Sequence, residues 1–404
     1  MKTILQLIMV FFIFISCEED QVNKESSPYT QKNINWVSLA DTPWPIYNHD
    51  VQNTNRSQFT GPPTTPSMTT VTFNKYIESA LTLDSENNIY ITSSLDKDGD
   101  AVVYFLNDQL ELNKVFDMSD NITSYIAPIF TSDSFVYTAG WEGYLYKFDL
   151  ATDSLLFSVY MDDNVWLSPS IDLSGNLIVS GDTKLQKFDQ SGTVVWTNDL
   201  FRIYKSGGLS QDGEFGYFPS VSYLYKIDLS DGEILSSIPT MASTPTISNE
   251  GHLFFGSIND TSVVCTDPNL NIIWKYFFGR NNGKEISLES GTMDYDGNFY
   301  IVGQNNYEQY ELLSFSFYGE LNWSNELDHN QWTSLLCDSN NNIYVQGRSS
   351  VPDGAFISSF NQDGLLNWKI ELPNISYEQP VISSERKIIL PAIDYTPINI
   401  VVLE

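Results

Sequence analysis

The sequence has few basic residues, few cysteines and few histidines, and each scarcity excludes a class of protein. Its 20 Lys and Arg stand against 51 Asp and Glu, and the net charge of −31 would repel both nucleic acid and anionic membrane surfaces. Its three His and three Cys form no cluster with metal-ligand spacing. Cys265 and Cys337 lie in apolar strand contexts of non-adjacent repeats and are expected to be buried free thiols.

Sequence motifs for catalysis are also missing. There is no G-x-S-x-G, and no Gly-rich turn opens onto a helix that would hold a phosphate. With 51 acidic residues some carboxylates must lie close together, but the sequence does not select a pair. We therefore predict no catalytic residue.

What the sequence does contain is one unit repeated eight times: a strand with small residues or proline, an acidic turn, a Tyr-rich strand, then a third strand and often a Trp. The clearest copies are residues 168–196 and 334–368. All-β repeats of 38 to 47 residues are typical of propeller blades. The aromatic content of 14% suits strands, and no helical period appears in the mature chain. The centres of the second strands are Tyr90, Tyr137, Ile178, Tyr217, Phe255, Tyr300, Tyr344 and Ile389.

The sequence thus predicts an all-β fold, an eight-bladed β-propeller with four-stranded blades. The eighth unit ends at Glu404 after three strands, so the N-terminus must supply the fourth. Residues 69–73 are the preferred closing strand and residues 34–39 the rival; closure would remove an open sheet edge. The ring would comprise residues 69–404, preceded by a lead-in, residues 34–68, whose Pro-, Asn- and Thr-rich part crosses a face of the disc.

The first 33 residues predict where the protein works. Residues 1–16 read as a signal peptide, because the apolar run is too short to span a membrane and ends at a lipobox-like Phe-Ile-Ser-Cys. Cys17 is the predicted lipidation site, and residues 17–33 the lipidated, flexible tether. The acidic residues 18–20 resemble a tag for export to the outer face of the outer membrane; the alternatives are a solvated linker and a periplasm-facing protein.

The repeat resembles the pyrroloquinoline-quinone-type propeller repeat, best seen in residues 136–157. Residues 43–57 are similar to the stretch that precedes the ring in that family, and the resemblance covers residues 34–404. It implies eight blades, as in the quinoprotein alcohol dehydrogenases and in the propeller lipoprotein of the outer-membrane assembly machine. Phe157 and Ser236 replace the Trp that docks one blade on the next in the family. The matching docking residues are Trp196, Trp274, Trp323 and Trp368.

The family contains both enzymes and scaffolds, so activity must be argued from the site. The enzymes carry an adjacent Cys pair under the quinone and often a haem-binding Cys-x-x-Cys-His, and neither occurs here. Their calcium ligands and catalytic Asp match no motif of this chain. We therefore expect a non-catalytic protein without a quinone, while a quinone- or calcium-dependent oxidoreductase and an outer-membrane assembly scaffold stay as alternatives.

One acidic loop could offer several oxygens to calcium. Its carboxylates, Asp96, Asp98 and Asp100, alternate around Gly99. Asn107 occupies the twelfth position, so the loop is not an EF-hand. The alternative is a solvated hairpin turn.

Aromatic residues recur where the chain enters the innermost strand of each predicted blade. Five of the eight residues three positions before the aligned inner strands are aromatic. This part of a blade lies beside the axial channel, and a loop residue of blade two should open on the same face. The predicted ligand-binding residues are Tyr125, Trp141, Trp166, Tyr204, Trp332 and Tyr377. Their rings would stack on a glycan or contact a protein partner, and the protein itself is expected to be a monomeric lipoprotein of the cell envelope. The alternative is that these rings only fill the channel.

Overall fold

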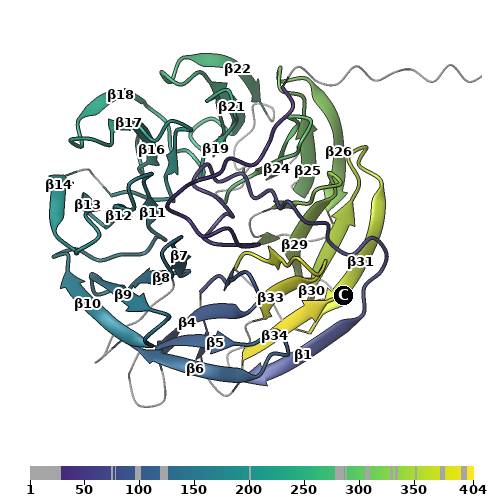
Figure 1. Cartoon of the computed structure of the whole chain (residues 1–404). Coiled ribbons are helices and arrows are strands. Elements are labelled where there is room, and N and C mark those ends of the chain that lie inside the picture. The colour runs from purple at the N-terminus through teal and green to yellow at the C-terminus, as the bar shows by residue number, and fades with distance from the viewer. Residues whose placement is uncertain are drawn as a thin grey trace, which may run out of the picture.

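The computed structural model describes residues 29–73, 76–77, 79–95, 102–118, 126–199, 202–277, 286, 289–304, 310–327, 331–332, 335–350, 353–373, 378–392 and 398–404. These residues contain strands and turns but no helix, and none of them forms a helix that could cross a membrane. Eight sheets stand side by side around a central axis (Figure 1). The predicted eight-bladed β-propeller is confirmed.

Each blade is an antiparallel meander whose first strand lies at the axis and whose last strand lies at the rim. Blade one comprises β2 (Tyr76–Ile77), β3 (Thr82–Leu83), β4 (Ile89–Leu95), β5 (Val102–Leu106) and β6 (Leu112–Asp117). Blade two comprises β7 (Ile129–Phe130), β8 (Phe135–Ala139), β9 (Tyr144–Asp149) and β10 (Ser154–Tyr160). Blade three comprises β11 (Ser170–Ile171), β12 (Leu177–Ser180), β13 (Leu185–Phe188) and β14 (Val194–Asn198). Blade four comprises β15 (Gly208–Leu209), β16 (Phe215–Pro219), β17 (Leu224–Asp228) and β18 (Ile234–Ile238).

The second half of the ring repeats this order. Blade five comprises β19 (Thr246–Ile247), β20 (Leu253–Ser257), β21 (Ser262–Thr266) and β22 (Ile272–Phe277). Blade six comprises β23 (Thr292–Met293), β24 (Phe299–Gln304), β25 (Tyr310–Phe315) and β26 (Leu321–Leu327). Blade seven comprises β27 (Gln331–Trp332), β28 (Leu336–Cys337), β29 (Ile343–Ser350), β30 (Asp353–Phe360) and β31 (Leu366–Leu372). Blade eight comprises β32 (Val381–Ile382), β33 (Ile388–Ala392), β34 (Ile398–Leu403) and β1 (Met68–Phe73).

An N-terminal strand closes the ring. β1 pairs antiparallel with β34 over six residues, from Met68 opposite Leu403 to Phe73 opposite Ile398. The strand preferred from the sequence, residues 69–73, is therefore the closing one, and the rival at residues 34–39 is wrong. The pairing covers the edge of a strand that would otherwise expose unpaired backbone groups.

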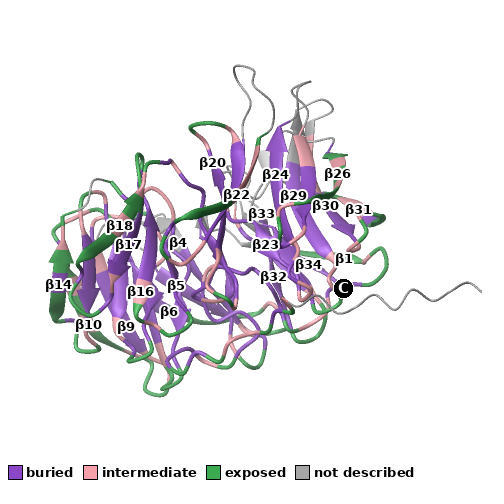
Figure 2. Cartoon of the chain, turned by 90° about the horizontal axis from the view of Figure 1, so that it is seen from above, coloured by how far each residue is buried: buried purple, intermediate pink, exposed green. Residues whose placement is uncertain are grey.

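The core lies between neighbouring sheets, and tryptophans link one blade to the next. Figure 2 shows the inner strands buried and the outer strands exposed. The Trp274 indole donates to the carbonyl of Phe317 in blade six at 3.0 Å, and Trp196 and Trp323 donate in the same way to Leu229 and Gln362 of the next blade. The Trp368 indole donates instead to the carbonyl of Pro62 in the lead-in. Cys265 in blade five and Cys337 in blade seven are buried free thiols, as predicted.

The predicted register of the second strands fails in blade five. Thr246 of the inner strand pairs with Phe254, so Phe254 and not Phe255 is the residue that corresponds to Tyr217 of blade four. Residues 253–255 are all apolar and all fully buried. Without an alternation of polar and apolar side chains, nothing in the sequence distinguishes the two registers.

The lead-in crosses one face of the disc and ties the blades together, in front of the ring in Figure 1. The last residue of the inner strand in blades one, two, four, five, six and seven donates its backbone NH to a lead-in carbonyl. The donors are Leu83, Phe130, Leu209, Ile247, Met293 and Cys337, and the acceptors are Trp44, Pro45, Val51, Gln52, Thr54 and Asn55. The Trp36 indole adds a 2.8 Å bond to Ile171 of blade three. The predicted crossing is confirmed.

The packed chain begins earlier than expected. Tyr29 stacks on Phe317 of blade six with ring centroids 3.9 Å apart, and Gln31 is buried and bonds to Tyr295. Residues 29–33, which the polar composition assigned to the flexible tether, are therefore held against the ring. The rest of the tether, the signal peptide and Cys17 lie outside the described residues.

Candidate functional site

Three asparagines of the lead-in close the axial channel at the face that the lead-in crosses. We name Asn48, Asn53 and Asn55 the hub. The amide of Asn53 donates to carbonyls of Gly207 and Pro245, and the amide of Asn55 to the carbonyl of Gly291. Each hub residue has a positive φ, between 52° and 61°, a conformation that Asn tolerates better than other side-chain-bearing residues. The hub thereby satisfies inner-strand carbonyls of blades four, five and six.

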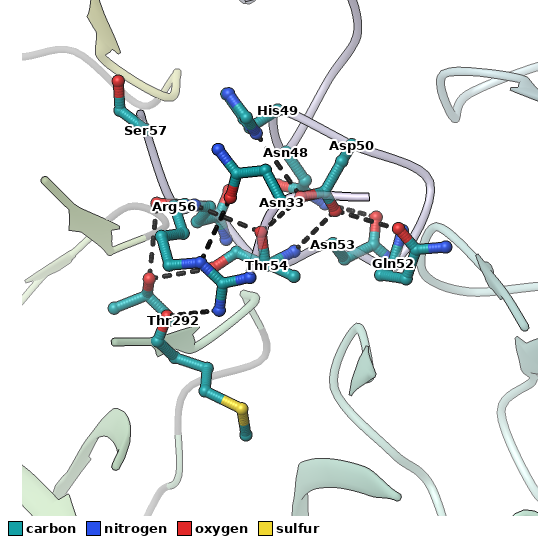
Figure 3. Close-up of polar contacts among 12 residues, drawn as sticks. Asn33, Asn48, His49, Asp50, Gln52, Asn53, Thr54, Arg56, Ser57 and Thr292 are labelled. Atoms are coloured by element: carbon teal, nitrogen blue, oxygen red, sulfur yellow. Dashed lines mark hydrogen bonds and ion pairs between the residues drawn. The ribbon is translucent and has the colours of Figure 1, made fainter. Parts of the chain in front are cut away.

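A partly buried carboxylate holds the lead-in loop in shape (Figure 3). Asp50 accepts hydrogen bonds from the backbone NH of Gln52 at 3.1 Å and of Thr54 at 3.0 Å. Its second oxygen accepts from the Thr54 hydroxyl and lies 3.4 Å from Nδ1 of His49. Burial alone would raise the pKa of Asp50, but the hydrogen bonds and charge of His49 and the bonds from Thr54 lower it below the usual value for Asp. The contacts of the loop therefore stabilise the ionised form of Asp50.

Arg56 anchors the end of the same loop with its guanidinium only 1% exposed. It donates to Asn33 at 3.3 Å, to the carbonyl of Met293 at 3.2 Å and to the carbonyl of Lys32 at 3.1 Å, and it lies over the ring of Tyr295. These bonds join the two passes of the lead-in to blade six. The Asp50 and Arg56 contacts are therefore structural.

The opposite end of the inner strands also carries a candidate site. The inner strands run from this end toward the lead-in, because the lead-in binds their last residues. A cavity of about 190 Å³ lies here, between blades three, four, five, six and eight, and we name it the mouth. Tyr47, next to the hub, lines it from within. The other lining residues are Trp166, Leu167, Ser168, Lys205, Ser206, Thr244, Glu289 and Glu378.

An ion pair and one further carboxylate give the mouth its charge. The Lys205 ammonium lies 2.7 Å from the Glu289 carboxylate, which reaches across from blade six. Glu378 of blade eight lines the same cavity. The mouth therefore offers hydrogen-bond donors and acceptors together with an excess of negative charge, which suits an uncharged polar ligand better than an anion.

Trp166 lines the mouth and packs against Trp141 of blade two. The rings of Trp141 and Trp166 lie 4.3 Å apart between centroids, tilted by 39°. The Trp166 indole NH donates to Asp182 at 2.7 Å, and Asp182 also accepts from Asn164. Trp166 stays 40% exposed, so a fixed indole presents its surface beside the cavity.

The structure brings together two of the six predicted ligand-binding residues, Trp141 and Trp166. Tyr204 is half-buried, and the Lys205 ammonium lies 5.6 Å from its ring centroid. Trp332 belongs to β27, and its side chain is not among the described parts. Tyr125, Tyr377 and the predicted calcium loop with Asp96, Asp98 and Asp100 lie outside the described residues.

The predicted aromatics do not occupy one equivalent position. Ala242 and Trp332 themselves bridge to the second strand of their blade, at Ser257 and Gly347. In blades three and four the bridging residues are Val165 and Ile203, one residue before Trp166 and Tyr204. Neighbouring residues of an extended chain point to opposite sides, so the fixed spacing used for the alignment mixed two orientations.

Sequence reasoning missed the charged residues of the mouth. Lys205, Glu289 and Glu378 come from three different blades, and in the sequence each is one charged residue among many. The only available signal was their position, just before the inner strands of their blades. The hub was missed too, although residues 48–56 are rich in Asn.

A larger cavity of about 280 Å³ opens on the other face, within the lead-in itself. Its lining, which includes Trp36, Asp41 and His49, comes entirely from residues 33–58. The mouth differs because it unites side chains from five blades, which only the closed ring can bring together.

The residues of the mouth do not fit the cofactor of the quinoprotein enzymes. That quinone is a planar tricarboxylate, whereas the mouth offers two glutamates and a single lysine that is already paired. Within the described ranges, no group of three or more His, Cys, Asp or Glu side chains could hold a metal ion. We derive no chemical step through either group.

Comparison with known proteins identifies the fold. No family model and no curated protein sequence matches the chain. The chain is similar in structure to BamB from Moraxella catarrhalis, with 12% identity, a TM-score of 0.63 and coverage of 84% of this chain and 99% of BamB. It is also similar to the quinohemoprotein alcohol dehydrogenase from Comamonas testosteroni, with 10% identity, a TM-score of 0.71 and coverage of 94% of this chain and 83% of the dehydrogenase. A europium-containing methanol dehydrogenase is similar as well, with 9% identity, a TM-score of 0.69 and coverage of 90% of this chain and 98% of the dehydrogenase.

These neighbours confirm the resemblance to propellers of the pyrroloquinoline-quinone type at the level of the fold. Their sequence identities, 9 to 12%, transfer no activity to this chain. Function has to be argued from the mouth and the surface.

Proposed function

We propose that this chain is a non-catalytic binding protein of the cell envelope, and that its mouth receives an uncharged saccharide unit. The observation that carries the proposal is the Trp141–Trp166 pair, which is held by Asp182 beside a cavity of about 190 Å³. An exposed indole offers a sugar ring a flat apolar face. Lys205, Ser206 and Glu289 supply donors and acceptors for its hydroxyl groups.

The tryptophan pair supplies the test. Titration with a panel of soluble neutral oligosaccharides, followed by indole fluorescence and calorimetry, is expected to find a binder. Trp166→Ala is expected to weaken that binder at least about tenfold, because a central aromatic contact contributes about 1.4 kcal/mol or more. Tyr160→Ala is the control, since Tyr160 is an exposed aromatic of the outer strand β10. If Trp166→Ala and Trp141→Ala bind the oligosaccharide with unchanged affinity, the mouth is not the saccharide-binding site.

The proposed anchor would point the mouth away from the membrane. Tyr29 packs on blade six at the lead-in face and lies 12 positions after Cys17. A chain of this length spans at most about 43 Å. With lipid on Cys17, the lead-in face would lie toward the bilayer and the mouth toward solvent.

We propose further that the protein faces the outside of the cell, on the basis of the acidic residues 18–20. Protease added to intact cells is then expected to degrade the propeller, while a periplasmic marker protein stays intact. Protection of the propeller until the outer membrane is permeabilised would place it in the periplasm instead.

A second candidate function is a scaffold for envelope assembly, in which the mouth holds a protein. The resemblance to the assembly-machine lipoprotein favours it, and the fold similarity covers 99% of BamB. A protein partner whose binding is lost in Trp166→Ala, together with no response to any oligosaccharide, would favour this candidate.

A further inference from the structure

The outer strands carry a β-bulge at the same place in blades one to seven. In each of these blades the register between the third and fourth strands shifts near the start of the outer strand, so one extra residue has no partner. The extra residues are Asn113, Leu156, Val195, Leu235, Ile273, Asn322 and Asn367. The same structural position is therefore filled by Asn in three blades and by an apolar residue in four.

The four apolar bulges lie in consecutive blades. Each is preceded by a second apolar residue, so the rim of blades two to five displays four pairs. We name these pairs the rim stripe. Its outer strands β10, β14, β18 and β22 follow one another along one half of the ring in Figure 1. The pairs are Leu155–Leu156, Val194–Val195, Ile234–Leu235 and Ile272–Ile273, and every one of these side chains is 40 to 51% exposed.

Blades six and seven show that this position does not require an apolar side chain. Asn322 donates to the Ser314 hydroxyl at 3.2 Å, and Asn367 makes the same bond to Ser359. The fold thus accepts a polar residue at the bulge and satisfies it locally. The exposed apolar residues at the bulges of blades two to five are therefore not explained by the stability of the blade.

Acidic turns adjoin the rim stripe. The turns that lead into its four strands, residues 149–153, 189–193, 228–233 and 267–271, contain no Lys or Arg of their own. Each receives one lysine from the preceding blade, so acidic groups are in excess rather than alone; the lysines are Lys114, Lys147, Lys187 and Lys226. The acidic residues of the turns are Asp149, Asp153, Asp189, Asp228, Asp231, Glu233 and Asp267. An anionic bilayer and a second copy of this chain, itself carrying −31, would both be repelled here. The complementary ligand has apolar side chains next to Lys or Arg.

We propose that the rim stripe is a docking surface for a segment of another protein in which apolar and basic residues alternate. This surface is separate from the mouth and does not depend on the function proposed for it. Apolar contacts with the bulge pairs would supply affinity, and the acidic turns would select the partner by charge.

The experiment uses the native asparagines as a guide. The variant carries Leu156→Asn, Val195→Asn, Leu235→Asn and Ile273→Asn, which copies the residue of the other three blades. The control carries Leu112→Asn, Leu321→Asn and Leu366→Asn, at the exposed apolar residues beside the native asparagines. Circular dichroism and thermal melting establish that each protein is folded. The single variant Val195→Asn replaces the fourfold one if that one does not fold.

The probe is a labelled synthetic peptide of alternating Leu and Lys, and fluorescence anisotropy reports its binding. We expect binding to the unaltered protein, a loss of about tenfold in the fourfold variant and of about twofold in Val195→Asn alone. The control and Trp166→Ala should bind as the unaltered protein does. The proposal is overturned if the fourfold variant binds the peptide as tightly as the unaltered protein does, or if a peptide of alternating Leu and Glu binds equally well. It is also overturned if binding to vesicles or self-association of the protein depends on the same four residues.

Discussion

Asp50→Asn is expected to lower the free energy of unfolding by about 3 kcal/mol at neutral pH. The carboxylate accepts two backbone bonds and a hydroxyl bond and faces His49, and bonds to a charged group contribute about 1.5 to 3 kcal/mol each. An amide would turn an NH₂ group toward at least one of these donors. Urea titration followed by tryptophan fluorescence measures the loss.

The loss should depend on pH in one direction. The folded-state pKa of Asp50 lies below its usual value, so the stabilisation by its charge is complete above about pH 4 and disappears as the pH falls through the folded pKa. The difference between Asp50→Asn and the unaltered protein should therefore shrink below pH 4. Asp41→Asn, an exposed position of the same lead-in, is the control and should change stability by less than about 0.5 kcal/mol. A constant difference down to pH 3 would show that the charge of Asp50 is not what stabilises the loop.

Gly319→Ala is expected to destabilise the ring by about 3 kcal/mol. Gly319 has a φ of +86°, which costs another residue about 1 kcal/mol or more. A Cβ atom at this position would also lie 2.5 Å from Cδ2 of Trp274, the docking residue of blade five. Displacing this partly buried indole adds about 1 to 3 kcal/mol. Thermal and urea unfolding of the variant measure the sum.

Two further variants separate the two causes. Gly251→Ala has a similar φ of +81°, but its nearest atom, in Pro268, is 3.0 Å away, so a loss of about 1 kcal/mol is expected. In a Trp274→Ala background, Gly319→Ala should also cost only about 1 kcal/mol. If the loss stays near 3 kcal/mol in that background, the contact between blades is not its source.

The sequence predicted the scaffold well because its signals are local and repeated. Two-residue periodicity, acidic turns and the recurring Trp identify each blade without knowledge of any other. The prediction of residues 69–73 as the closing strand follows from one further fact, that the eighth unit lacks a fourth strand. These features are averaged over eight copies, so the one-residue error at Phe254 does not change the fold.

The candidate site was predicted only in part. Trp141 and Trp166 do meet, but the aligned positions that the structure describes are not equivalent from blade to blade. The offset from the bridging residue to the inner strand differs among blades, from four positions between Ala242 and Thr246 to six between Ile286 and Thr292. An alignment with fixed spacing cannot follow such differences, because each shift of one residue reverses the direction of the side chain.

The sequence by itself determined the number of blades, the order of their strands and the way the ring closes, because these depend on patterns within about 45 residues of chain. Only the tertiary structure decided what meets at the axis. The Lys205–Glu289 pair joins residues 84 positions apart, and Asn53 reaches carbonyls 154 and 192 positions away. Such contacts have no local signature, since they exist only once eight blades surround one channel.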